Sequence, residues 1–86
     1  MQISIDCSAI QTREDLHRIF AEGLDFPSWY GNNLDALHDQ LTSLSGIVRL
    51  EHWSTAETAL GKYGHAAKKV MAHAALENER LLLIFS

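Results

Sequence analysis

This sequence has few cysteine and proline residues, with one of each among its 86 residues. Cys7 has no second cysteine with which to form an internal disulfide bridge, and the histidines lack the spacing of a metal-ligand set along the chain. We therefore expect no metal and no cofactor. Because thiols stay reduced in the cytoplasm, a chain without a disulfide framework favours a cytoplasmic location.

Long hydrophobic runs are also absent. No apolar stretch approaches the roughly 20 residues that span a bilayer, and the N-terminus has no basic segment followed by an apolar one. A sequence pI near 5.6 contrasts with the basic face that nucleic-acid binding requires. We therefore expect neither a membrane nor a nucleic acid as partner. With 47% hydrophobic residues, chain 1–86 is expected to form one domain with a modest core.

Lysine and arginine are missing from the segment between Arg18 and Arg49. Four acidic residues fall inside this segment: Glu22, Asp25, Asp35 and Asp39. The other 7 acidic residues (11 minus 4) are equal in number to the 7 lysines and arginines, so this segment accounts for the formal net charge of −4. A local negative field beside the aromatic pair Trp29 and Tyr30 indicates a docking surface for a basic partner.

Hydrophobic periodicity predicts three strands and four helices. The expected order is a strand at Met1–Ile5, a helix capped by Thr12, a helix from Asn32 or Asn33 to about Ser45, a strand at Ile47–Leu50, a helix starting at Ser54, a helix from Tyr63 to about Asn78, and a strand at Leu81–Phe85. Helices between successive strands imply crossover connections, which join parallel strands. The sequence therefore predicts a small α/β fold with a three-stranded parallel sheet.

Several boundaries rest on specific local signals. Ser54-Thr-Ala-Glu57 has the pattern of a capping box, and Gly46 is expected to end the second helix. The continuous apolar run Leu81–Phe85 predicts a strand that is covered on both faces. We expect Tyr30, Trp53 and Cys7 in or near the core, and Trp29 at the surface.

The second predicted helix has two different sides. Its apolar side is expected to carry Leu34, Leu37, Leu41 and Leu44. Its other side is expected to carry Asp35, His38, Asp39 and Thr42. Taken alone, Asp35 has the position of a favourable charge near a helix N-terminus, and Asp39 that of an ordinary solvated residue.

The block Pro27-Ser-Trp-Tyr-Gly-Asn-Asn-Leu-Asp-Ala-Leu-His-Asp-Gln-Leu-Thr42 resembles the barstar family, the intracellular inhibitors of a secreted bacterial ribonuclease. The resemblance extends from Asp15-Leu-His17 through Leu50-Glu51 and Trp53 to the closing apolar strand. It implies a barstar-like fold in which the second helix and its preceding turn plug a ribonuclease active site. The implied partner is a basic, secreted ribonuclease of barnase type.

Carried over residue by residue, the resemblance implies that Asp39 enters the pocket of the ribonuclease that normally holds a substrate phosphate. It also implies that Asp35 pairs with a second basic group nearby. Trp29, Gly31 and Asn33 would form the adjoining contact surface. The full set of partner-binding residues predicted in this way is Trp29, Gly31, Asn33, Leu34, Asp35, His38, Asp39, Thr42 and His73. The chain departs from the family's pattern where His38 replaces a tryptophan, Trp29 a tyrosine, and His73 an acidic residue.

Two other functions stay open at this point. The changed contact residues allow a barstar-like interaction module whose target is not a ribonuclease. Alternatively, Asp35 and Asp39 on one helical face, with Cβ atoms roughly 6 Å apart, could act as an acid and base pair in a small enzyme. The chain has no nucleophile motif or phosphate-binding glycine loop, which favours an inhibitor without catalytic residues. The sequence leaves the oligomeric state open.

Overall fold

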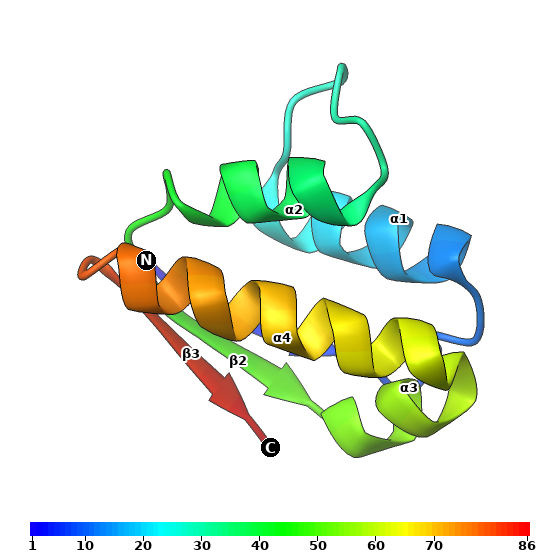
Figure 1. The fold of residues 1–86 in the computed structure, drawn as a ribbon. Helices are drawn as coiled ribbons and strands as arrows, with labels where there is room; N and C mark the ends of the chain where they lie inside the picture. Colours follow the sequence, from blue (N-terminus) through cyan, green and yellow to red (C-terminus); the bar gives the residue numbers. More distant parts are fainter.

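The computed structural model describes residues 1–86 as three strands and four helices (Figure 1). In chain order these are β1 (Gln2–Asp6), α1 (Arg13–Leu24), α2 (Leu34–Leu41), β2 (Gly46–Glu51), α3 (Trp53–Leu60), α4 (Lys62–Glu77) and β3 (Leu81–Phe85). Order and type agree with the prediction from hydrophobic periodicity. None of the helices combines the length and the hydrophobicity needed to cross a membrane.

The three strands form one parallel sheet in the order β1-β2-β3. Gln2 is paired with Ile47, and Gly46 is paired with Leu81. Gly46 has a φ of +133° and lies so close to the chain that an added Cβ would be 2.3 Å from the carbonyl oxygen of Met1. Only glycine fits this position, where β2 starts beside the N-terminus. The predicted α/β fold with parallel pairing is confirmed.

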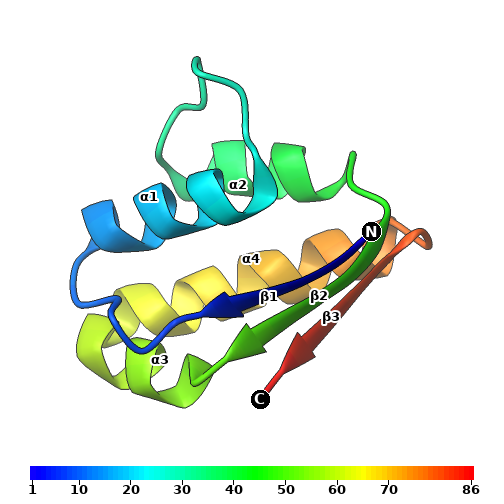
Figure 2. The same ribbon diagram turned by 180° about the vertical axis from the view of Figure 1, so that it is seen from behind.

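Helices cover one face of the sheet, and no helix lies over the strands on the side seen in Figure 2. Leu81 at the start of β3 is buried, whereas the next residue, Leu82, is 53% exposed. Arg49 in the central strand is also exposed on this side. The prediction that Leu81–Phe85 is covered on both faces was therefore wrong. Its apolar run reflects an edge strand with one buried face, not a strand between two helical layers.

The core lies between the sheet and the helices and is centred on aromatic contacts. The indole of Trp53 is 2% exposed and meets the rings of Phe20 and Phe85 at centroid distances of 6.5 and 5.8 Å. Thr12 caps α1 with the predicted geometry: its hydroxyl accepts from the Asp15 N–H over 3.1 Å, and the Asp15 carboxylate accepts from the Thr12 N–H. Local capping thus fixes where α1 begins.

The second helix ends at Leu41, not near Ser45 as predicted. Beyond Leu41 the backbone forms a hydrogen bond of the 3₁₀ type, in which the Leu44 N–H donates to the Leu41 carbonyl over 3.3 Å. The carbonyl oxygens of Leu41 and Leu44 also accept from the side-chain amide of Asn78, over 2.9 and 2.7 Å. These partners replace continued helical bonds, so α2 stops about one turn early. Gly46 therefore belongs to β2 and does not end the helix.

The predicted capping box at Ser54 was also wrong. Helix α3 begins at Trp53, and its N-cap residue is His52, which has a left-handed backbone with a φ of 59° and whose side chain accepts no capping hydrogen bond. The Glu57 carboxylate, predicted to close the box, instead accepts from the Trp53 indole N–H over 3.0 Å. It also contacts the His65 ring nitrogen Nδ1 at 2.6 Å. Contacts to the core and to α4 thus replace the local cap.

Candidate protein-binding surface

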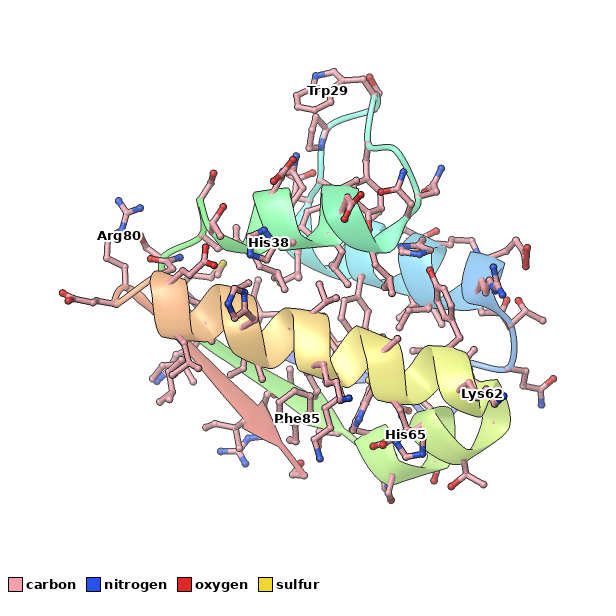
Figure 3. All side chains as sticks on the ribbon, in the orientation of Figure 1. Trp29, His38, Lys62, His65, Arg80 and Phe85 are labelled. Carbon is pink, nitrogen blue, oxygen red and sulfur yellow. The ribbon has the colours of Figure 1, made fainter.

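The turn between α1 and α2 projects from the body of the protein and carries Trp29 at its tip (Figure 3). Trp29 is 77% exposed, whereas its neighbour Tyr30 is buried. The Tyr30 hydroxyl lies 2.7 Å from Nδ1 of His17, and the Tyr30 ring packs against Phe26 with centroids 4.7 Å apart. A buried tyrosine therefore anchors the base of the turn, while the neighbouring tryptophan is exposed at its tip. Both placements agree with the sequence-based expectation.

Gly31 and Asn33 set the direction in which α2 leaves this turn. Asn33 is the N-cap of α2: its side-chain oxygen accepts from the Ala36 N–H over 2.8 Å. The other end of the same amide donates to the Gly31 carbonyl over 3.2 Å. A Cβ at Gly31 would lie only 3.2 Å from the Asn33 amide nitrogen, so a larger residue would disturb the cap. Both residues have a structural role in addition to the partner contact predicted for them.

Asp35 and Asp39 lie one turn apart on α2, and both are exposed. The Asp39 side chain is 82% exposed, and its carboxylate approaches only the His38 ring, at 3.8 Å from Nδ1. No lysine or arginine forms a salt bridge with either carboxylate. Two exposed carboxylates without a lysine or arginine partner can form charge-assisted bonds with cationic groups of another molecule.

Two of the predicted partner-binding residues, Leu34 and Thr42, also make contacts within the chain. Leu34 is half-buried and packs against the core. The Thr42 hydroxyl donates to the Asp39 main-chain carbonyl over 2.8 Å, which closes the end of α2. They therefore shape the surface that carries the two carboxylates.

His38 turns toward α4, although its sequence position placed it with the solvent-facing residues of α2 (Figure 3). Its side chain is only 28% exposed, and its Nε2 lies 3.4 Å from a Glu77 carboxylate oxygen. The His38 ring stacks on the His73 ring at a centroid distance of 5.7 Å and an interplanar angle of 28°. The Nδ1 of His73 lies 3.0 Å from the other Glu77 oxygen. The structure thus joins two predicted contact residues and adds Glu77, which the sequence analysis did not identify.

Cations border the acidic helix in space although none occurs within its segment of the sequence. Lys69 lines the same surface hollow as Asp35, His38 and His73, between α2 and α4. Between α1 and the start of α2, Arg13 and Arg18 line a second hollow with Glu14, Asn32, Asn33 and Leu34. Lysine and arginine therefore lie near α2 in the folded chain, and the exposed Asp35 and Asp39 are the acidic residues that α2 itself contributes.

A buried histidine, His17, links the turn that carries Trp29 to the helices of the protein. His17 is 2% exposed, and its two ring nitrogens lie 2.7 Å from the hydroxyls of Tyr30 and Tyr63. Burial lowers the pKa of His17 and raises the pKa of Tyr30 and of Tyr63. The neutral imidazole, with one donor and one acceptor nitrogen, suits this pair of hydroxyls. This contact connects α1, the projecting turn and α4.

Comparison with known proteins agrees with this arrangement. The family described as Barstar (barnase inhibitor) matches residues 1–85. A Bacillus subtilis (strain 168) protein named "Putative ribonuclease inhibitor YrdF" is 37% identical over 76 residues, which cover 85% of this chain and 84% of that protein. The match includes the strands, all four helices and the projecting turn. From both similarities, the chain belongs to the barstar family of ribonuclease inhibitors.

Proposed function

We propose that this protein is a non-catalytic inhibitor that occludes the active site of a basic ribonuclease of barnase type. The projecting turn and α2, from Trp29 to Thr42, would enter the cleft. The observation that carries the proposal is the pair of exposed carboxylates, Asp35 and Asp39, which lie one turn apart and form no salt bridge with a lysine or arginine of the chain. A ribonuclease cleft is basic because it binds a polyanion, so these carboxylates can replace consecutive phosphates.

Each part of this surface would have a separate task in the complex. Asp39 would be the central anchor, since its carboxylate is 82% exposed and has no salt bridge to lysine or arginine. Asp35 would contact a second basic group, and Trp29 would add apolar contact area at the edge of the cleft. His38 and His73 would meet the partner through the hollow between α2 and α4. Gly31, Asn33, Leu34 and Thr42 would hold and complete this surface.

We further propose that the protein acts in the cytoplasm as one domain, in an immunity-like role against a ribonuclease that is otherwise secreted. The single, buried Cys7 suits a reducing compartment because the fold depends on no disulfide. In this role the inhibitor would bind the active enzyme before export and keep it from cellular RNA.

A ribonuclease assay tests the proposal directly. Purified barnase-type ribonuclease is titrated with the wild-type protein, with Asp39→Asn and with Glu79→Gln, which makes the same change in net charge at an exposed site outside α2. The wild type and Glu79→Gln should inhibit stoichiometrically. Asp39→Asn should weaken inhibition by roughly 30-fold or more, because one member of a desolvated charge pair is lost.

Two results would contradict the proposal in different ways. Absence of inhibition by the wild type would exclude this class of target. It would favour a barstar-like module with another partner, for which the stacked His38 and His73 form the most distinctive surface. Equal weakening by Asp39→Asn and Glu79→Gln would show that net charge alone, and not the position of Asp39, controls binding.

A further inference from the structure

Three side chains from two helices converge at the surface beside the proposed docking helix. His38 comes from α2, and His73 and Glu77 come from α4, where they are one turn apart. One potential ligand atom from each residue can be chosen so that all three lie within 4.8 Å of one another. Spacing along the sequence did not indicate the whole group, because the two histidines are 35 positions apart (73 minus 38).

The distances resemble those between ligands of a small divalent cation. Zinc binds histidine nitrogen and carboxylate oxygen at roughly 2.0–2.2 Å with tetrahedral geometry, so two of its ligand atoms are about 3.3 Å apart. The His38 Nε2 lies 3.4 Å from Glu77 Oε2, and the His73 Nδ1 lies 3.0 Å from Glu77 Oε1. The stacked rings, 5.7 Å apart and inclined by 28°, direct both nitrogens to the same carboxylate. Small side-chain rotations would bring all three atoms around one ion.

The chemistry of the three groups selects the class of metal. Two imidazoles and one carboxylate are ligands for zinc and neighbouring transition metals, whereas calcium and magnesium prefer oxygen ligands. A site with three protein ligands leaves a fourth position for water or for a group of another molecule. Here that position would open toward solvent, since His73 and Glu77 are both exposed.

The surroundings orient the ligands. With Nε2 of His38 directed to a metal, its Nδ1 is left on the side of the Asp39 carboxylate, 3.8 Å away, which is too far for a hydrogen bond but adds negative charge near the site. Asn78 holds the end of α2 against the end of α4 through its bonds to Leu41 and Leu44. Lys69 lines the adjoining hollow and opposes a cation there, while Asp35 in the same hollow offsets that charge. The packing of α2 against α4 thus brings the three side chains together, and rotation of the exposed His73 and Glu77 side chains would complete the site.

We propose that His38, His73 and Glu77 form a binding site for a divalent transition metal of the zinc class. His38 and His73 also belong to the surface proposed to meet the ribonuclease, but the three ligands are supplied by this chain alone, so metal binding can be tested without a ribonuclease. It replaces the sequence-based expectation of no metal, which rested on spacing within the chain and not on contacts between helices.

Calorimetric titration of zinc chloride into the purified chain, without a polyhistidine tag and without ribonuclease, tests the site. The wild type should bind one zinc ion per chain. His38→Gln and His73→Gln should each lower zinc affinity by at least the roughly 10–100-fold that follows loss of a residue that only orients a ligand. The matched control is His65→Gln, because His65 also contacts a glutamate, Glu57, but has no third ligand beside it.

Circular dichroism of each variant verifies that the helices are intact, and cobalt chloride supplies a second readout. Cobalt bound by the three ligands should give a visible absorption band that His73→Gln abolishes and His65→Gln keeps. Absence of saturable 1:1 zinc binding by the wild type would overturn the proposal and leave the three residues as a hydrogen-bonded cluster. Equal loss in His65→Gln would also overturn it, because binding would then depend on histidine content alone.

Discussion

The side-chain amide of Asn78 donates to the main-chain carbonyl of Leu41 over 2.9 Å, although 37 positions separate the two residues. The same nitrogen donates to the Leu44 carbonyl over 2.7 Å, and Asn78 itself is 5% exposed. This one amide therefore joins the loop after α4 to the end of the helix that carries Asp35 and Asp39.

Substitution of Asn78 by alanine should lower the free energy of unfolding by roughly 1–3 kcal/mol, because buried carbonyls lose their donor. Urea denaturation monitored by circular dichroism measures this difference. Gln11→Ala is a suitable control, since the Gln11 side chain is exposed and surface changes of this kind stay within about 0.5 kcal/mol. Equal stability of Asn78→Ala and the control would show that water replaces the amide without cost.

The contrast between local and long-range signals explains which features the sequence could predict. The order of strands and helices follows from periodicity, and the cap at Thr12 depends on Asp15, only three residues away. The early end of α2 depends on Asn78, and the start of α3 on contacts of Glu57 outside its own turn. Such partners become visible only when the chain is folded.

The same reasoning applies to the candidate site. The exposure of Asp39 and Trp29 and the burial of Tyr30 could be predicted, because each follows from local amphipathic pattern and turn chemistry. The contact of His38 with His73 depends on how α2 packs against α4. The spacing of His73 and Glu77 by four residues was a usable signal on one helix, but nothing local indicated the third member.

Stability should depend on pH through His17. Its burial lowers the pKa in the folded state below the ordinary value of about 6.5. The unfolded chain therefore binds the proton more readily, and Glu14, which faces His17 from the same helix, offsets this only in part. The stabilising contribution of neutral His17 is complete above about pH 6.5 and is lost as the pH falls through the folded-state pKa.

Urea denaturation at neutral pH and near about pH 5 tests this dependence. His17→Gln should be less stable than the wild type at neutral pH, because glutamine cannot reach both the Tyr30 and Tyr63 hydroxyls with the geometry of the ring. The variant should also lose less stability on acidification than the wild type does. His52→Gln, at an exposed position, should keep the wild-type dependence. Identical acid sensitivity of His17→Gln and the wild type would contradict the assignment.

Cys7 should be inert in the folded protein. Its side chain is fully buried, and burial, with smaller effects of the Asp6 and Glu51 charges, raises the pKa of the thiol to about 12. Because the thiolate is the reactive form, a disulfide reagent such as DTNB should react slowly with the native chain and rapidly in denaturing urea. Rapid reaction without denaturant would show that the end of β1 opens readily.

Trp29 and Asp39 should affect complex formation in different ways if the protein inhibits a ribonuclease as proposed. Long-range attraction depends on charge and is screened over about 8–10 Å at ordinary ionic strength, whereas apolar contact forms only in the docked complex. Asp39→Asn should therefore reduce the association rate and its dependence on salt. Trp29→Ala should leave both nearly unchanged and speed dissociation by roughly tenfold or more, as expected for an aromatic residue at an interface.

Stopped-flow association at low and moderate salt, combined with dissociation by competition, separates the two effects. Trp29→Ala should also leave the free energy of unfolding within about 0.5 kcal/mol of the wild type, because the indole is 77% exposed and no core contact is lost. A changed association rate with unchanged dissociation in Trp29→Ala would place the tryptophan outside the docked interface. An association rate of the wild type that does not change with salt would instead contradict the role of the carboxylates, because electrostatic attraction must weaken when salt screens the charges.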